Sequence, residues 1–135
     1  MVRPVLLRIQ NLEEVMLSVR IDTIGEMAVV ECEGRIEQID DDFILRDAVT
    51  AQRNARTIVL DLSEVTAIEG GSLGMLVFLK RWAQDYDIRF KLFNPSKFVR
   101  SRLKKVSSIS EFDIPSLDEM MALLARSDRR YEVAA

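Results

Sequence analysis

The sequence contains no histidine and a single cysteine, Cys32, among its 135 residues. The absence of histidine excludes histidine general bases, histidine-activated nucleophiles and histidine metal ligands. One cysteine cannot form an internal disulfide or a cysteine-rich zinc site. Because Cys32 lies in an apolar, strand-like run between Glu31 and Glu33, we expect a small buried side chain and not a reactive thiol.

Long apolar runs are also missing. No stretch approaches the roughly 18–20 apolar residues that a bilayer-spanning helix needs. Near the start of the chain, only Pro4 to Leu7 is free of polar and charged residues, which is too short for the core of a signal peptide. We therefore expect no membrane insertion and a cytoplasmic protein.

The sequence has no large excess of basic over acidic residues, or of acidic over basic ones. The chain has 19 Lys and Arg against 22 Asp and Glu, and its net charge is −3. Nucleic-acid binding usually requires a basic surplus on one face, so we expect no nucleic-acid partner. With 48% hydrophobic and 30% charged residues, the composition is that of a globular protein about one domain long.

The order of the predicted elements defines one domain, residues 16–126, between an N-terminal extension (1–15) and a flexible tail (127–135). Alternation of apolar and polar residues, or a β-branched apolar run, predicts strands at 16–23, 27–33, 57–62, 89–93 and 112–114. Helical spacing predicts helices that start near residue 40, at 72–86 and 97–105, and after 116. A loop is expected from Ser63 until the helix at 72.

Helix starts have clear signals. Asp40 to Asp42 stand where carboxylates suit free N–H groups and the helix dipole, and three adjacent aspartates on a helix cannot all face one metal ion. We expect Ser96 to cap its helix, and Ser116 with Glu119 to form a capping box. The last helix should bury a stripe made of Met120, Leu123 and Leu124.

An initial hairpin followed by alternating helices and strands predicts an α/β fold. We expect a mixed sheet of four or five strands, with about four helices packed mainly on one face.

The segment from Ile58 to Phe78 reads IVLDLSEVTAIEGGSLGMLVF. It resembles the STAS domain family, the sulfate-transporter and anti-sigma-factor-antagonist domain. That family has an apolar strand ending in Asp-Leu-Ser, an apolar spacer, and Asp-Ser-Ser/Thr-Gly-Leu-Gly at the start of a helix. Asp61-Leu62-Ser63 and Leu73-Gly74 match these two motifs. Gly34-Arg35-Ile36 and Leu92-Phe93-Asn94-Pro95 resemble two further family segments.

The resemblance implies a regulatory protein that binds a serine-kinase-type anti-sigma factor and is switched by phosphorylation of a serine in this loop. Here Glu69 replaces the family aspartate, and Gly70 stands at the phosphoacceptor position. Gly71 follows, and Ser72 occupies a position where the family has glycine. Because Gly70 cannot accept a phosphate, the usual switch is in doubt for this chain.

The loop leaves two interpretations open for its residues. Ser72 is either the N-cap of the following helix or a displaced phosphorylation site. Gly70 and Gly71 form either a tight turn or an open loop that a partner approaches closely.

The helix after the loop carries an apolar arc composed of Met75, Leu76, Phe78, Leu79, Trp82, Ala83 and Tyr86. Leu73 and Val77 fall on its polar side. They are expected to form an exposed patch for a protein partner, unless the N-terminal extension or a loop covers them. The basic helix 97–105 is either a solvated face or a dock for an acidic surface.

No catalytic constellation, metal site or cofactor motif emerges from the sequence, so we do not expect an enzyme. The preferred function is that of an anti-sigma-factor antagonist, with a homodimer as a possible state. Two other functions stay open: an adaptor subunit of a signalling or transport assembly, and a domain that binds a nucleotide or other small ligand at the loop.

Overall fold

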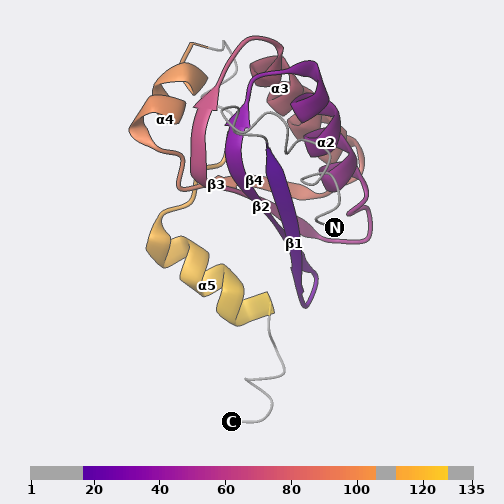
Figure 1. Cartoon of the computed structure of the whole chain (residues 1–135). Helices are drawn as coiled ribbons and strands as arrows, with labels where there is room; N and C mark the ends of the chain where they lie inside the picture. The colour runs from indigo at the N-terminus through magenta and orange to yellow at the C-terminus, as the bar shows by residue number, and fades with distance from the viewer. Residues whose placement is uncertain (1–16, 106–111, 128–135) are drawn as a thin grey trace.

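The computed structural model describes residues 17–105 and 112–127. Within them, four strands form one sheet in the order β1-β2-β3-β4 (Figure 1). The strands are β1 (Ser18–Ile24), β2 (Met27–Ile36), β3 (Thr57–Ile68) and β4 (Arg89–Phe93). β1 pairs antiparallel with β2, whereas β2, β3 and β4 are parallel. The predicted extension lies outside the described residues, and so does the predicted tail beyond Ser127.

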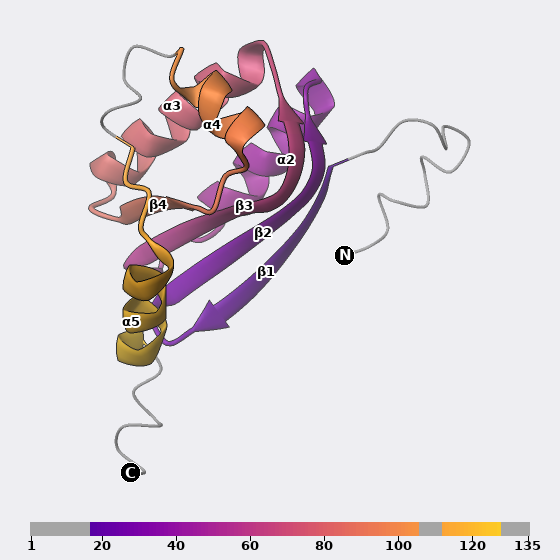
Figure 2. The same ribbon diagram turned by 90° about the vertical axis from the view of Figure 1, so that its left-hand side faces the viewer.

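Four helices accompany the sheet in the described residues: α2 (Ile39–Thr50), α3 (Gly71–Asp85), α4 (Lys97–Leu103) and α5 (Leu117–Ser127). Figure 2 shows α2, α3 and α4 on one face and α5 on the other. The sheet grows in one direction through β2-α2-β3-α3-β4, and right-handed crossovers then place successive helices on the same face. The predicted α/β fold, a mixed sheet with helices mainly on one face, is confirmed.

Each face of the sheet has its own hydrophobic core. The larger core lies under α2, α3 and α4 and includes Val30, Leu60, Leu45, Leu76 and Val99. The smaller one lies under α5 and consists of Met27, Val29, Val59 and Met120, with Leu123 and Leu124 packed against it. β2 and β3 are therefore covered on both faces, as is typical of parallel strands.

The turn between β1 and β2 is held close to the end of α5. Gly25 adopts a φ of 59°, a left-handed conformation that glycine takes without steric cost. A Cβ atom at Gly25 would lie 1.9 Å from the carbonyl oxygen of Ser127. Glycine is therefore required here both for the turn and for the approach of α5.

β2 and β3 are longer than the sequence predicted. β3 continues beyond Leu62 to Ile68, where a loop was expected, and β2 continues beyond Glu33 to Ile36. The two ends pair with each other after register shifts near Glu33 and Gly34, so the apolar residues of the predicted spacer form the end of a buried strand. These shifts break the alternation on which the prediction depended.

Two other predictions were wrong in part. Residues 112–114 form no strand; a single parallel bridge joins Asp113 to Lys91. Phe78 of α3 and Tyr86 at its C-cap are exposed instead of contributing to the core, because the buried stripe is narrower than the apolar arc. The predicted caps of α4 and α5 are confirmed: Ser96 accepts from Val99 N, and the Ser116–Glu119 capping box is present.

Candidate functional site

The β3–α3 loop, Glu69 and Gly70, lies where the parallel strands β2 and β3 end. The backbone N–H of Glu69 donates to the carbonyl of Ile36 at 3.1 Å, so the loop begins as a continuation of the β2–β3 pairing. In α/β sheets, the carboxyl ends of parallel strands are the usual place for binding residues, because loops and helix starts converge there.

The first turn of α2 reaches this loop. As predicted, Asp40 to Asp42 occupy that turn, although the N-cap is Gln38. The carboxylate of Asp41 accepts from the backbone N–H groups of Gln38 at 3.0 Å and Glu37 at 3.2 Å, which satisfies donors that a helix start leaves unpaired. Asp42 instead faces α3.

Ser72 connects the two helix starts. Its side chain is fully buried, and its hydroxyl donates to Oδ1 of Asp42 at 2.5 Å. Of the two interpretations of Ser72, the one that makes it the N-cap of α3 is wrong, because the N-cap position belongs to Gly70. Its burial also argues against phosphorylation, since a kinase requires an accessible hydroxyl.

Gly70 has a backbone that other residues rarely adopt. Its φ is 56° and its ψ is −131°, a combination open mainly to glycine. A Cβ atom at Gly70 would meet nothing within 4 Å. The glycine is thus required by conformation and not by crowding, and the space above it is open to another molecule.

The carboxylate of Glu69 is already paired within the domain, with a residue of α4. Its carboxylate forms an ion pair of 2.9 Å with Arg102, whose guanidinium carbon lies 4.9 Å from the centre of the Phe98 ring. This contact links the loop to the basic helix and fixes the side chain of Glu69 beside Gly70.

The predicted exposed patch of Leu73 and Val77 differs in the structure. Both side chains are half-buried and pack against the larger core. The exposed apolar residue of α3 is Phe78, of which 48% is accessible. Phe78 follows the exposed Gly74 by one helical turn and therefore lies on the same outer side as that residue.

A second exposed apolar pair lies on the outer side of α2. Ile39 and Phe43 are one turn apart, with 68% and 47% of their surface accessible. The Ser72–Asp42 bond holds the start of α2 beside the start of α3. We call the surface formed by Ile39, Phe43, Gly70, Gly71, Gly74 and Phe78 the α2–α3 surface. Sequence periodicity missed Phe43 and Ile39 because apolar residues near a helix start also serve as core.

The Asp-Leu-Ser motif, Asp61 to Ser63, has a structural role near the middle of β3. Asp61 accepts from both the backbone N–H of Ser63 at 2.9 Å and its hydroxyl at 2.5 Å. Ser63 in turn accepts from the side-chain amide of Asn94 at 3.1 Å. Through Ser63 and Asn94, the motif therefore connects β3 to the segment that follows β4.

Neither a metal centre nor a reactive thiol is found in the described part of the chain. Across residues 17–105 and 112–127, no three acidic, cysteine or histidine side chains are grouped so that they could hold an ion. Burial, with a smaller effect of the Asp61 carboxylate, raises the pKa of the Cys32 thiol to about 12. None of the described helices is both long and apolar enough to cross a membrane.

These features define a small α/β domain whose candidate site is a surface that contains three glycines and three exposed apolar side chains. The sequence matches the STAS domain model over residues 18–119, and the chain belongs to this family. Among curated proteins, no sequence matches this chain.

Solved structures resemble the fold at low sequence identity. The unphosphorylated anti-sigma factor antagonist SpoIIAA has a TM-score of 0.66 at 14% identity, over 79% of this chain and 96% of that one. An anti-sigma factor antagonist from Mycobacterium paratuberculosis has a TM-score of 0.68 at 18% identity, over 80% and 93%. The murine anion transporter Solute Carrier 26 family member A9 has a TM-score of 0.66 at 13% identity, over 91% of this chain but 24% of that one.

Proposed function

We propose that this chain is a regulatory protein-binding module of the cytoplasm that captures a serine-kinase-type anti-sigma factor through its α2–α3 surface. The observation that carries the proposal is the exposure of Ile39, Phe43 and Phe78 near two exposed glycines, Gly70 of the loop and Gly71 at the start of α3. Exposed apolar groups clustered on one side of a small domain favour a protein partner over a small ligand.

The α2–α3 surface is held in shape before any partner binds. The Ser72–Asp42 hydrogen bond joins α2 to α3, and the Glu69–Arg102 ion pair links the loop to α4. A surface already ordered in the free protein loses less conformational entropy on binding. These contacts within the free protein support a role in protein recognition.

We further propose that capture of the partner does not depend on phosphorylation at the family position. Gly70 has no hydroxyl, and the nearby hydroxyl of Ser72 is buried. In relatives that are switched, a phosphate would add about −1.5 to −2 charges beside the helix start and expel a partner by desolvation and repulsion. This chain has no exposed acceptor at either position.

The experiment is calorimetric titration of the purified chain with the serine-kinase-type anti-sigma factor of the same organism. We expect binding by the wild type and a loss of about tenfold or more for Phe78→Arg, because a buried aromatic anchor often carries about 2 kcal/mol of an interface. The matched control is Met121→Arg, which alters an apolar side chain of α5 that is 57% exposed on the other face. If the wild type does not bind, the proposal of an anti-sigma-factor partner is wrong. If Phe78→Arg and Met121→Arg weaken binding equally, the α2–α3 surface is not the binding site.

A second function, that of an adaptor subunit, is supported by the likeness to the anion transporter, in which a similar domain is part of a much longer chain. It uses the same surface but a different partner. If the anti-sigma factor fails to bind and a transport subunit encoded by a neighbouring gene binds in a Phe78-dependent way, the adaptor function replaces the first proposal.

A further inference from the structure

The outer edge of β1 has no partner strand in the part of the chain that the structure describes. β1 is the first strand in the order β1-β2-β3-β4, and its inner edge pairs with β2. Every second residue of an edge strand directs its N–H and C=O away from the sheet, where another strand can pair with them. At the opposite edge, Lys91 of β4 is bridged to Asp113, whose carbonyl accepts from the N–H of Leu92 at 2.9 Å. β1 is therefore the open edge of this sheet.

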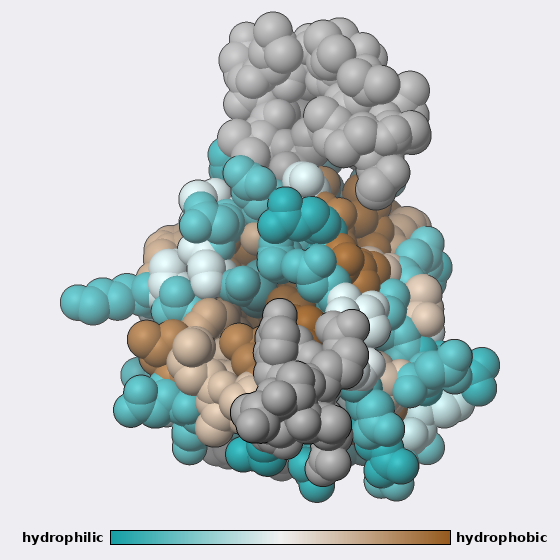
Figure 3. Space-filling view, turned by 90° about the horizontal axis from the view of Figure 1, so that it is seen from below, coloured by the Kyte–Doolittle hydropathy of each residue, from teal (hydrophilic) through white to brown (hydrophobic). Residues whose placement is uncertain are grey.

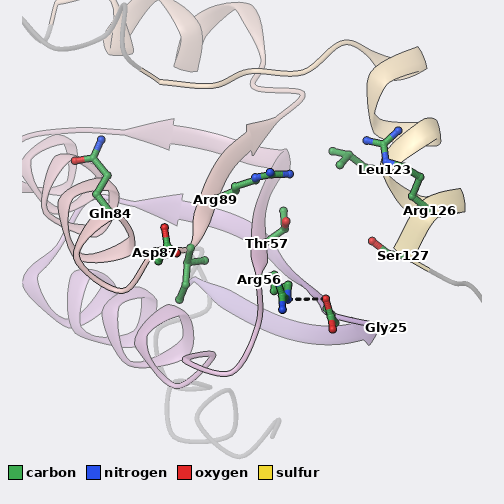
Figure 4. Close-up of a pocket in the computed structure, with 11 residues that line it drawn as sticks. Gly25, Arg56, Thr57, Gln84, Asp87, Arg89, Leu123, Arg126 and Ser127 are labelled. Carbon is green, nitrogen blue, oxygen red and sulfur yellow. Dashed lines mark ion pairs between the residues drawn. The ribbon is translucent and has the colours of Figure 1, made fainter.

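The turn after β1 is joined to the segment before β3. Glu26 and Arg56 form an ion pair of 2.9 Å, drawn as a dashed line in Figure 4, and the backbone N–H of Arg56 donates to the carbonyl of Glu26 at 2.8 Å. Five of the seven residues of β1 are exposed, including Arg20, Ile21 and Asp22. The strand thus presents accessible side chains on a backbone that is already extended, which lowers the entropy lost on pairing.

The surroundings of β1 favour pairing through the backbone and through charged side chains. Seen from below, the described side chains at the end of the molecule where β1 meets its turn are largely hydrophilic, with apolar ones between them (Figure 3). A cavity of about 990 Å³ lies nearby, at the start of β3 and β4, but none of the residues that line it belongs to β1. An exposed strand edge of this kind is the feature that strand addition uses.

Symmetry limits how two copies of β1 can pair. Homodimers are usually twofold symmetric, so that the same patch meets itself. When identical edges pair antiparallel, the twofold axis is perpendicular to the sheet, and residues directly opposite each other project to the same face. Each residue therefore stands opposite itself or opposite a residue an even number of positions away. The registers with the greatest overlap are centred on Arg20, on Ile21 or on Asp22.

The charges on β1 select one of these registers. A register centred on Arg20 would place arginine opposite arginine, and one centred on Asp22 would place aspartate opposite aspartate. Like charges directly opposite each other destabilise a strand pair. In the register centred on Ile21, all seven residues of β1 are paired, and Arg20 of each copy stands opposite Asp22 of the other. Two complementary charge pairs then cross the interface.

The face that carries these charges continues the pattern into β2. Arg20 and Asp22 pair with Glu31 and Val29 of β2, and Val29 belongs to the smaller core, so all four residues project to the face of α5. Arg20 forms an ion pair with Glu31, whereas Asp22 has no ion-pair partner among the described residues. In the dimer, Glu31, Arg20 and Asp22 of the second copy would form a row of alternating charge.

The other face of β1 is apolar at the centre of this register. Ile21 pairs with Val30, which belongs to the larger core, and 37% of its surface is accessible. The two Ile21 side chains would meet, and Val19 would stand opposite Thr23 of the second copy; such β-branched pairs stabilise neighbouring strands. We propose that β1 is a homodimer interface, in which two copies pair antiparallel about Ile21 and join their four-stranded sheets into one.

The test is charge reversal in the full chain, followed by analytical ultracentrifugation. The wild type should dimerise reversibly as its concentration rises. Arg20→Glu places acidic side chains opposite each other, and Asp22→Arg places arginines opposite each other. Each variant alone should dimerise at least about tenfold more weakly, because two repulsive pairs replace two attractive ones. The two variants mixed in equal amounts should form a heterodimer, because each then meets the opposite charge on the other.

A matched control and a second readout accompany the charge variants. Asp85→Arg reverses an exposed carboxylate at the end of α3, outside β1, and should dimerise like the wild type. Hydrogen exchange of the wild type requires no variant. The backbone amides of β1 should exchange more slowly as the dimer forms, whereas those of β4 should keep their rate.

Several results would overturn the proposal. They are a wild type that stays monomeric up to about 1 mM, a mixture of the two charge variants that forms no heterodimer, and an equal weakening by Asp85→Arg. A monomer whose β1 amides are protected at every concentration would show that another segment of the same chain covers the edge, which also contradicts it. The measurements use no anti-sigma factor, so this proposal and the proposed function are tested separately.

Discussion

The hydroxyl of Ser72 donates a 2.5 Å hydrogen bond to the carboxylate of Asp42, and this bond joins the first turn of α3 to the first turn of α2. The serine is fully buried. Its partner in α2 is thirty residues earlier in the chain, so the contact exists only in the folded domain. It determines how the two helix starts present the α2–α3 surface.

Replacing Ser72 with alanine should lower the free energy of unfolding by about 1–3 kcal/mol, because the bond to the charged Asp42 is lost. The measurement is urea denaturation followed by circular dichroism. Ser101→Ala, which alters an exposed serine of α4, is the control and should change stability by less than about 0.5 kcal/mol. Equal effects of the two changes would contradict the structural role of Ser72. Phosphopeptide mapping after incubation with the native kinase should also find Ser72 unmodified.

A serine restored at position 70 should destabilise the domain. Gly70→Ser forces a side chain into the φ of 56° and ψ of −131°, which costs about 1–3 kcal/mol. Gly74→Ala provides the contrast, since its Cβ would meet nothing within 4 Å in the helix. That change should stabilise the protein by up to about 1 kcal/mol. Thermal unfolding of both variants checks the prediction, and a stabilised Gly70→Ser variant would show that the loop conformation is wrong.

Gly25→Ala should separate α5 from the sheet. The added Cβ would lie 1.9 Å from the Ser127 carbonyl and would also occupy a φ of 59°. Hydrogen exchange should accelerate in α5 more than in α2 or α3, because the smaller core under α5 is independent of the larger one. Glu26→Ala, at the next turn position, should leave exchange in α5 unchanged. Uniform acceleration in all helices would mean that the two cores do not open separately.

Cys32 should resist thiol reagents in the folded protein. Burial raises its thiol pKa from 9.0 to about 12, so little thiolate forms at mildly alkaline pH. The folded chain keeps this proton where the unfolded chain loses it, and stability from Cys32 is therefore lost as the pH rises from about 9 to about 12. Comparison with Cys32→Ala over this range isolates the effect. A wild type that loses no more stability than the variant would contradict it.

Val77→Arg and Phe78→Arg should differ although the positions are adjacent. Val77 packs against the larger core, and an arginine there should lower the unfolding free energy by about 1–3 kcal/mol. Phe78 is 48% exposed, so its change should stay within about 0.5 kcal/mol. Chemical denaturation of both variants gives the comparison. A large loss for Phe78→Arg would show that Phe78 belongs to the core.

The sequence alone predicted the elements whose signals are local. Ser96 and the Ser116–Glu119 pair mark helix starts by their own hydrogen bonds to nearby N–H groups. The β-branched run from Thr57 to Leu60 predicts a buried strand. The predicted order, a hairpin followed by alternating helices and strands, indicated an α/β fold. Short connections and right-handed crossovers leave few other arrangements of these elements.

Contacts between distant segments could not be predicted in this way. The end of β3 is a strand because β2 pairs with it beyond a register shift. Gly70 and not Ser72 occupies the N-cap of α3, and the hydroxyl of Ser72 bonds to Asp42, which is distant in the sequence. Met120 joins Met27 and Val59 in one core only because α5 returns to the far side of the sheet. Local sequence thus determined the elements and the family, whereas packing between them decided which side chains are buried, which are exposed and which meet.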